Sequence, residues 1–201
     1  MREKWRSRAP FFIIDSHPVH VCRKTRAGKK KRLGGLAQNG YCKALRYGFH
    51  GVREHLIVTP EGRIAMLVQI PGNRHDVQGL YALLNTTFRG HLIGDNAYWP
   101  REDMDPELIR HGICMTAKTR EGFKFQYPAC FSEELHRERA HIERRISLFN
   151  IQFHAGRTLN RSRHHYLARR WTKALAHNLT RDINASFGLP LESIASFRAV
   201  A

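Results

Sequence analysis

The sequence lacks several features that would assign it to large classes of proteins. It has no run of 18 apolar residues, so we expect no transmembrane helix. Its four cysteines form no close Cys-x-x-Cys pair, so a structural zinc site is unsupported. The basic first ten residues precede only four strongly apolar ones, too few for a secretory signal peptide. These absences favour a cytoplasmic protein with reduced thiols.

Acidic residues are missing from one long segment. From Ser16 to Arg53 there is no Asp or Glu, whereas ten residues are Lys or Arg, seven of them between Arg23 and Arg32. The whole chain has a formal charge of +17. Because such an excess attracts polyanions, nucleic acid is the expected partner. A membrane surface is not expected, since no long basic amphipathic helix with an aromatic face dominates the sequence.

The length and composition predict one folded domain with short ends. The chain has 201 residues, of which 42% are hydrophobic, enough for an ordinary core. We expect a basic lead over residues 1–10, a domain over 11–185 and a tail over 186–201. Within the domain, the basic residues 17–47 are rich in glycine and are expected to form a loop.

Short apolar runs predict the strands of an α/β fold. Phe11 to Ile14 are four large apolar residues in a row, as in a strand that is buried on both faces. Two further runs flank the turn at 60–63 and predict a hairpin. The expected strands cover residues 11–14, 51–59, 64–70, 91–95 and 113–117.

Apolar spacing predicts the helices. Short helices are expected over 77–84 and 105–112, and two long ones from about 132 and over 162–186. One face of the first long helix is marked by residues spaced seven, four, three and four: Leu135, Ile142, Ile146, Phe149 and Phe153. The last helix contains Leu167, Trp171, Leu175, Leu179 and Ile183.

Three acidic residues occupy suggestive positions in this order of elements. Asp15 ends the first expected strand, Asp95 ends the fourth, and Glu143 lies at the edge of the long helix's apolar face, where we expect it partly covered. The expected order of elements is three antiparallel strands, helix, strand, helix, strand and helix. A ribonuclease-H-like mixed sheet has this order. In such a sheet, strands one and four are adjacent, so the three carboxylates could converge on two divalent cations.

Each acid also has a simpler interpretation. Asp15 and Asp95 could merely end strands and cap turns. Glu143 could form an ion pair with Arg139, four residues earlier on the helix. Asp76 is a rival acid, which we interpret as the cap of the helix at 77–84 and a hydrogen-bond acceptor.

Five motifs in order carry a resemblance to a known family. They are Ile14-Asp15-Ser16; Tyr47-Gly48-Phe49 with His55-Leu56-Ile57-Val58-Thr59; Pro71-Gly72-Asn73-Arg74-His75-Asp76; Gly94-Asp95-Asn96-Ala97-Tyr98; and Arg139 with Glu143. From about residue 11 to residue 180, the sequence resembles the DDE transposases of bacterial insertion sequences. The resemblance is to the group marked by a tyrosine–arginine–glutamate–lysine signature.

The resemblance implies a ribonuclease-H-like catalytic domain that cleaves DNA ends and transfers strands during transposition. It implies two Mg²⁺ or Mn²⁺ ions held by Asp15, Asp95 and Glu143, with Asp15 bridging both. Its implied partners are terminal inverted repeats, target DNA and a second copy of the chain, in the bacterial cytoplasm with the nucleoid. The side chains expected to contact DNA are Arg23, Lys24, Lys29, Lys30, Lys31, Arg32, Arg139 and Arg144.

The sequence departs from the family pattern at accessory positions. His136 stands at the signature tyrosine, Asn150 at its lysine, and Ala97 at the second glycine of the second-aspartate motif. Because only ten residues precede Phe11, we expect this chain to lack the separate N-terminal DNA-binding region that members usually carry. Two alternatives therefore stay open: a truncated, catalytically impaired DNA-binding remnant, and a related ribonuclease-H-like nuclease that hydrolyses without strand transfer.

Overall fold

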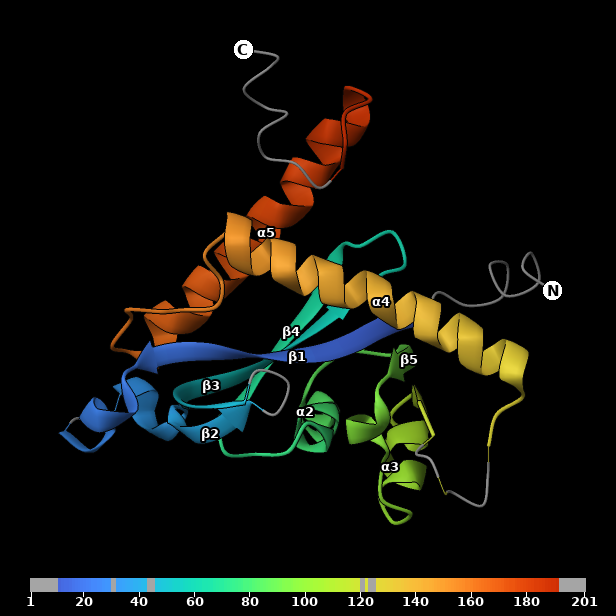
Figure 1. The fold of residues 1–201 in the computed structure, drawn as a ribbon, viewed down its shortest axis with the longest axis horizontal. Coiled ribbons are helices and arrows are strands. Elements are labelled where there is room, and N and C mark those ends of the chain that lie inside the picture. The colour runs from blue at the N-terminus through green and yellow to red at the C-terminus, as the bar shows by residue number, and fades with distance from the viewer. Residues whose placement is uncertain (1–10, 30–31, 43–45, 120–121, 123–125, 192–201) are drawn as a thin grey trace. The chain divides into compact units, whose positions relative to one another are not determined.

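The structure is a computed structural model that describes residues 11–29, 32–42, 46–119, 122 and 126–191 (Figure 1). The expected basic lead, most of the expected tail, and Lys30 and Lys31 lie outside these residues. Within them, no helix has both the length and the apolar character that a membrane span requires.

Six strands form one mixed sheet. Strand order is β2-β3-β1-β5-β6, with β4 paired to β3. Neighbours β1, β5 and β6 run parallel, whereas β2 and β3 are antiparallel. This sheet with flanking helices confirms the predicted ribonuclease-H-like α/β fold. The strands are β1 (Phe11–Cys22), β2 (Gln38–Cys42), β3 (Tyr47–Val58), β4 (Ile64–Pro71), β5 (Gly90–Gly94) and β6 (Ile113–Ala117).

Four α-helices and four 3-10 helices complete the described chain. The α-helices are α2 (Val77–Ala82), α3 (Asp105–Arg110), α4 (Ala129–Gln152) and α5 (Arg163–Ser186). The 3-10 helices are η1 (Lys24–Lys29), η2 (Arg32–Gly35), η3 (Leu83–Asn85) and η4 (Asn96–Tyr98). The described residues fall into two compact units.

Two predictions about the first 50 residues are wrong. β1 does not end at Asp15 but continues to Cys22, because Val19 and Val21 alternate with polar residues and are buried. The basic segment 17–47 is not a loop, since it contains the second half of β1, the helices η1 and η2, and strand β2. Strand β2 pairs with β3 from Gln38 opposite Gly51 to Cys42 opposite Tyr47.

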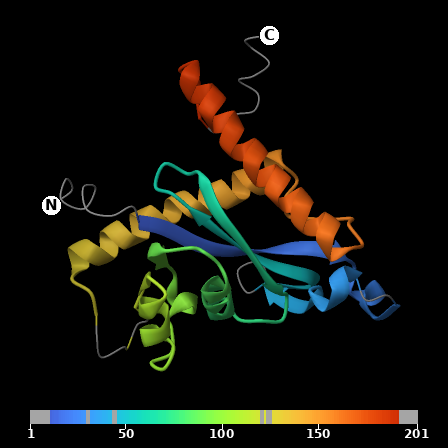
Figure 2. The same cartoon turned by 180° about the vertical axis from the view of Figure 1, so that it is seen from behind.

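The first unit comprises residues 11–16, 54–70 and the described part of 74–144. Figures 1 and 2 show α2 and α3 on one side of the start of β1 and the first part of α4 on the other. The strands and the short helices share one apolar core. It includes Ile14, Ile57, Val68, Leu80, Leu83, Leu92, Tyr98, Leu108 and Ile113.

The second unit comprises the described residues of 17–53, 71–73 and 145–191. Its core joins β1, η2 and β3 to Tyr166 of α5 through Val19, Val21, Leu33, Leu36, Ala37 and Val52. Helix α5 begins after Ser162, whose hydroxyl accepts a hydrogen bond from the His165 amide at 3.2 Å.

The long helices differ in which side chains they bury. In α4, Leu135, Ile142, Ile146 and Phe149 are all buried, which confirms four members of its predicted apolar face. The fifth, Phe153, lies just beyond the end of α4 and is partly buried. In α5, however, the residues that predicted the helix do not form its buried face. Trp171, Leu175 and Leu179 are 43%, 68% and 54% exposed, whereas Arg170, Ala174, His177 and Arg181 are buried.

Candidate functional site

Asp15 and Asp95 occupy equivalent positions on adjacent parallel strands. The register pairs Phe11 with His91 and Ile13 with Ile93. Asp15 lies two residues beyond Ile13, and Asp95 lies two beyond Ile93, immediately after β5 ends. Because side chains alternate along a strand, the two carboxylates belong to the same face as these paired isoleucines.

That face is the one that carries α4. Ile14 belongs to the core cluster with Leu80 of α2 and Leu108 of α3. The side chain of Asp15, next along β1, therefore points to the opposite face. The first part of α4 lies on this side of the start of β1 (Figures 1 and 2).

Burial makes the Asp15 carboxyl a weaker acid than an ordinary aspartate. Its half-buried carboxylate accepts a hydrogen bond from the Ser16 amide at 2.8 Å. Loss of hydration raises the pKa of Asp15 to about 7, and the nearby charges of Asp95 and Asp76 add to this rise. The Ser16 hydrogen bond and the charge of Arg139 act in the opposite direction. Asp15 is therefore poised between its two protonation states at neutral pH.

Asp95 combines a turn role with a place in the acidic cluster. Its carboxylate caps η4 by accepting a hydrogen bond from the Ala97 amide at 2.9 Å, as the simpler interpretation expected. Burial raises its pKa, and the charges of Asp76 and Glu143 contribute to the rise. The field of Arg139 opposes it. Capping and membership of the cluster are thus compatible.

Arg139 and Glu143 form the expected ion pair on α4. One Arg139 guanidinium nitrogen lies 3.2 Å from a Glu143 carboxylate oxygen. The Arg139 side chain is only 15% exposed, whereas that of Glu143 is 61% exposed. The expectation that Glu143 would be partly covered is therefore wrong, because the arginine occupies the inner position. Arg139 acts electrostatically on both aspartates, so it belongs to the site.

Asp76 does not cap α2 through its side chain. It occupies the N-cap position but has a helical backbone conformation, and its carboxylate makes no cap hydrogen bond. It instead accepts a hydrogen bond from the Ser16 hydroxyl at 2.5 Å. Asp76 thus stands at the predicted N-cap position without capping the helix through its side chain, and its predicted role as a hydrogen-bond acceptor is confirmed.

A buried chain of hydrogen bonds continues behind Ser16. The phenol of Tyr98 is buried, bonds to the Ser16 side chain, and lies 2.7 Å from His55 Nδ1. The Ser16 hydroxyl donates to Asp76, and the Tyr98 phenol has hydrogen-bonding partners in both Ser16 and His55. Burial and the three nearby aspartates raise the pKa of Tyr98 well above its ordinary value, so it stays protonated.

The ring of His55 is fixed by close packing as well as by Tyr98. A Cβ placed on Gly79 of α2 would come within 2.4 Å of this ring, so only glycine allows the helix to approach. Sequence reasoning assigned no role to Ser16, His55 or Tyr98. Each nevertheless lies inside a motif that it identified, and that is the signal that could have drawn attention to them.

Comparison with known families identifies the family of this chain. The sequence matches the family described as transposase DDE domain over residues 7–166. The chain belongs to the DDE transposase family. Comparisons with curated proteins and with solved structures give no match. Members of this family are transposases or nucleases that act on DNA and generally use divalent metal ions.

The acidic groups of this DDE domain suit a hard divalent cation in their chemistry. All are carboxylates, the ligands that Mg²⁺ prefers, and the crowding of like charges around Asp15 is what a cation would relieve. Among the described residues, no three acids, histidines or cysteines already surround one ion position. The ion pair of Glu143 with Arg139 is consistent with that open arrangement.

The basic residues predicted to contact DNA fall in different environments. Arg23, Lys24 and Arg144 are exposed, and Lys29 and Arg32 belong to η1 and η2. Arg139 is held inside the carboxylate site rather than on the surface. Lys30 and Lys31 lie outside the described residues.

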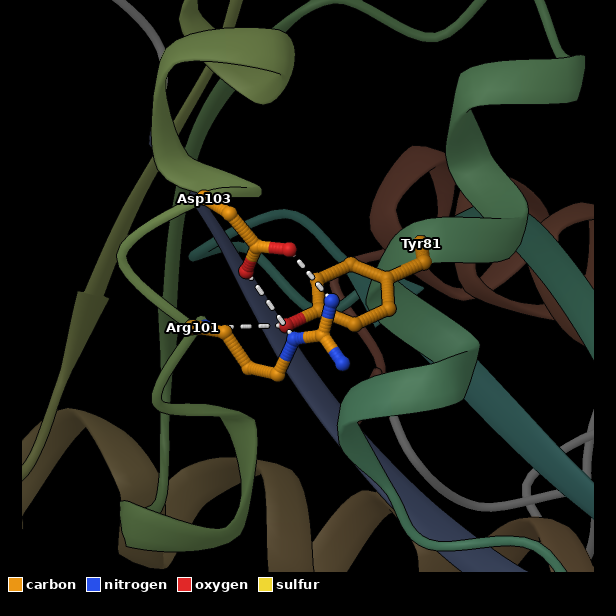
Figure 3. A network of polar contacts seen from close by, with 3 residues as sticks. All are labelled: Tyr81, Arg101 and Asp103. Carbon is orange, nitrogen blue, oxygen red and sulfur yellow. Dashed lines mark hydrogen bonds and ion pairs between the residues drawn. The ribbon is translucent and has the colours of Figure 1, made fainter.

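A separate polar contact fixes the chain beyond Asp95. The Arg101 amide donates to the Tyr81 phenol of α2 at 2.9 Å (Figure 3). The Arg101 guanidinium also pairs with Asp103, with its Nε 3.0 Å from a carboxylate oxygen. Both charged side chains are more than 60% exposed, so the pair contributes little to stability. Asp103 is therefore a useful control acid outside the site.

Proposed function

We propose that this chain is the catalytic core of an insertion-sequence transposase that cleaves DNA ends and transfers them to target DNA. The observation that carries the proposal is the pair of aspartates at equivalent positions of β1 and β5. They face the helix that bears Arg139 and Glu143. The family match supplies the DNA substrate and the general class of reaction.

Asp15, Asp95 and Glu143 would hold two Mg²⁺ or Mn²⁺ ions. When bound, such ions activate the attacking oxygen and stabilise the leaving oxygen in phosphoryl transfer. The charge of Arg139 opposes the rise in the pKa of Asp15 and of Asp95. More of each carboxylate therefore stays ionised and able to bind a cation. It also restrains Glu143, which must give up this ion pair to join the two aspartates.

The overall reaction exchanges one phosphorus–oxygen bond for another. In end cleavage, water adds to the scissile phosphorus, and the bond to the 3′ oxygen breaks, leaving a 3′-hydroxyl. In strand transfer, that hydroxyl attacks a target phosphodiester and displaces a target 3′ oxygen. Ser16 and Tyr98 bind no DNA in this scheme, and they hold the acidic cluster in place from the core side.

A catalytically impaired remnant is the second candidate function. The observation that favours it is the exposed Glu143 carboxylate, which is paired with Arg139 rather than directed to the aspartates. His136, at the signature tyrosine, is exposed as well. A remnant would bind DNA in a salt-dependent manner and would cleave none.

Cleavage of end-labelled DNA tests the proposal. The substrate carries the inverted repeats that flank the gene, and the reaction contains Mg²⁺ or Mn²⁺ with a plasmid target. We expect nicked ends and joined products, and a loss of roughly 10³-fold in Asp15→Asn, Asp95→Asn and Glu143→Gln. The matched control is Asp103→Asn, which removes an exposed acid and should leave the rate unchanged.

Three results would decide against parts of this proposal. Full activity in any of the three site variants removes that residue from the catalytic set. Cleaved ends without joined products identify a hydrolytic nuclease. Salt-dependent binding with no metal-dependent product identifies the remnant.

A further inference from the structure

A hollow lined by cations lies within the second unit. Its volume is about 490 Å³, and it is formed by the segment between α4 and α5 together with the first half of α5. Among the described residues that line it, none is acidic. Its lining includes Arg157, Thr158, Asn160, Arg169, Arg170 and Lys173. We call this feature the arginine hollow.

The wall of the arginine hollow is a strained helix end. The Ala155 amide donates to the Asn150 carbonyl at 3.2 Å, the long hydrogen bond of a Schellman helix end. His154 lies between them with a φ of 48°, a left-handed conformation that glycine usually adopts. For a residue with a Cβ this conformation costs about 1 kcal/mol, so other contacts must hold it.

Two of the four cations supply those contacts. Lys173 Nζ donates to the His154 carbonyl at 2.7 Å. The buried Arg170 donates to the Ala155 carbonyl at 2.6 Å, and its guanidinium lies 5.4 Å from the centre of the Phe149 ring. Cations suit the carbonyls at a helix C-terminus, so these two residues have a structural role. They fix the segment that bears Arg157 to helix α5.

The other two cations have no such structural role in the described contacts. Arg157 and Arg169 are exposed at the arginine hollow. The positive field there reaches β1, since the charge of Arg157 adds to burial in lowering the pKa of His20. Thr158 donates its hydroxyl to the Asn160 side-chain oxygen at 2.8 Å, which leaves the amide NH₂ as the donor end of Asn160. The arginine hollow thus combines cations with hydrogen-bond donors, and none of the described residues that line it is acidic.

We propose that the arginine hollow binds a phosphodiester of the DNA backbone, with Arg157 and Arg169 as its direct contacts. None of these residues belongs to the carboxylate site. The proposal rests on the proposed function only in taking DNA as the ligand. Guanidinium groups form bidentate hydrogen bonds with phosphate oxygens. Because the wall of the hollow is preformed, less conformational entropy is lost on binding. The contacts are to the backbone, so binding is independent of sequence.

DNA binding without metal tests this site. Fluorescence anisotropy is measured on a 30-base-pair duplex in EDTA, from 50 to 200 mM salt, for the whole chain. We expect Arg157→Gln with Arg169→Gln to weaken binding about tenfold and to reduce the salt slope by about 2. The matched control is Arg161→Gln with Arg163→Gln, two exposed arginines of the same unit outside the arginine hollow. It should weaken binding less than threefold.

Two outcomes overturn the proposal. Equal losses in the two double variants show a diffuse basic surface rather than a site. Calorimetric binding of pyrophosphate that the hollow variant abolishes, with duplex binding unchanged, shows a site for free phosphates. Absence of cleavage by the unmodified chain would overturn the proposed function and leave this test unaffected, because binding is measured without metal.

Discussion

The two units of this DDE transposase domain handle charge in opposite ways. The first unit brings acids together under partial burial, so that the pKa of Asp15 rises to about 7. The second unit gathers cations around an open hollow and buries only Arg170 among the four. A buried carboxylate can lose its charge by taking up a proton, whereas a guanidinium stays charged at every relevant pH.

This difference predicts that the two sites respond to different solution conditions. The carboxylate site should respond to pH and to divalent cations, since both alter the repulsion around Asp15. The arginine hollow should respond to salt, because its exposed charges are screened within about 10 Å at 0.1 M.

The largest effect is expected on the pH dependence of stability. The pKa of Asp15 is 3.8 in the unfolded chain and about 7 in the folded one. Between these values the folded state binds the extra proton, so stability falls as pH rises through this window and remains low above it. The Asp15→Asn variant lacks this loss of stability. At pH 8 it should be more stable than the unmodified chain by at most about 4 kcal/mol.

Urea unfolding at pH 4.5 and pH 8 measures the effect. The stability gap between Asp15→Asn and the unmodified chain should widen at the higher pH, and Mg²⁺ should narrow it by stabilising only the chain that keeps Asp15. The control Asp103→Asn changes an exposed acid and should show no widening gap. A gap that is equal at both pH values would mean that burial of Asp15 carries no such cost.

The next effect concerns the buried cation of the second unit. Arg170→Leu removes a charged hydrogen bond to the Ala155 carbonyl and the contact with the Phe149 ring, so we expect a loss of about 3 kcal/mol. Its exposed neighbour provides the control, since Arg169→Gln should stay within about 0.5 kcal/mol. Thermal unfolding compares the two. Similar losses in both variants would contradict the division of the cations into structural and binding pairs.

Sequence reasoning located the strands and acids better than it located their contacts. Apolar runs marked β1 and β5, and the order of motifs led to Asp15 on β1, Asp95 directly after β5 and Glu143 on α4. The equivalence of Asp15 and Asp95, however, depends on register between strands that are distant in sequence. The fold family supplied that adjacency, and no local pattern could.

The errors have the same physical origin. Pro18 and the alternating histidines concealed the second half of β1, because its apolar residues number only Val19 and Val21. In α5, periodicity predicted a helix but not its buried face, since Arg170 is buried through contacts with a helix end that lies elsewhere in the sequence. Side chains that satisfy buried carbonyls leave no periodic signal.

The smallest effect tests whether the chain from His55 to Asp76 supports the carboxylate site. Ser16→Ala removes the donor to Asp76 and a hydrogen-bonding partner of Tyr98, so we expect a loss of about 1.5 kcal/mol in stability and about tenfold in cleavage rate. Ser16→Thr keeps the hydroxyl and suits a strand, so it should restore most of both.

A double-mutant cycle then separates the hydrogen bond from general damage. If Ser16 acts through Asp76, the double variant Ser16→Ala with Asp76→Ala should be little less stable than either single variant, with a coupling of about 1 kcal/mol. The same cycle between Ser16 and the exposed Asp103 should show additive effects. Additivity between Ser16 and Asp76 would mean that the 2.5 Å hydrogen bond does not link the core to the carboxylates. The pH response of Asp15 would then arise from burial and from the charges of its neighbours alone.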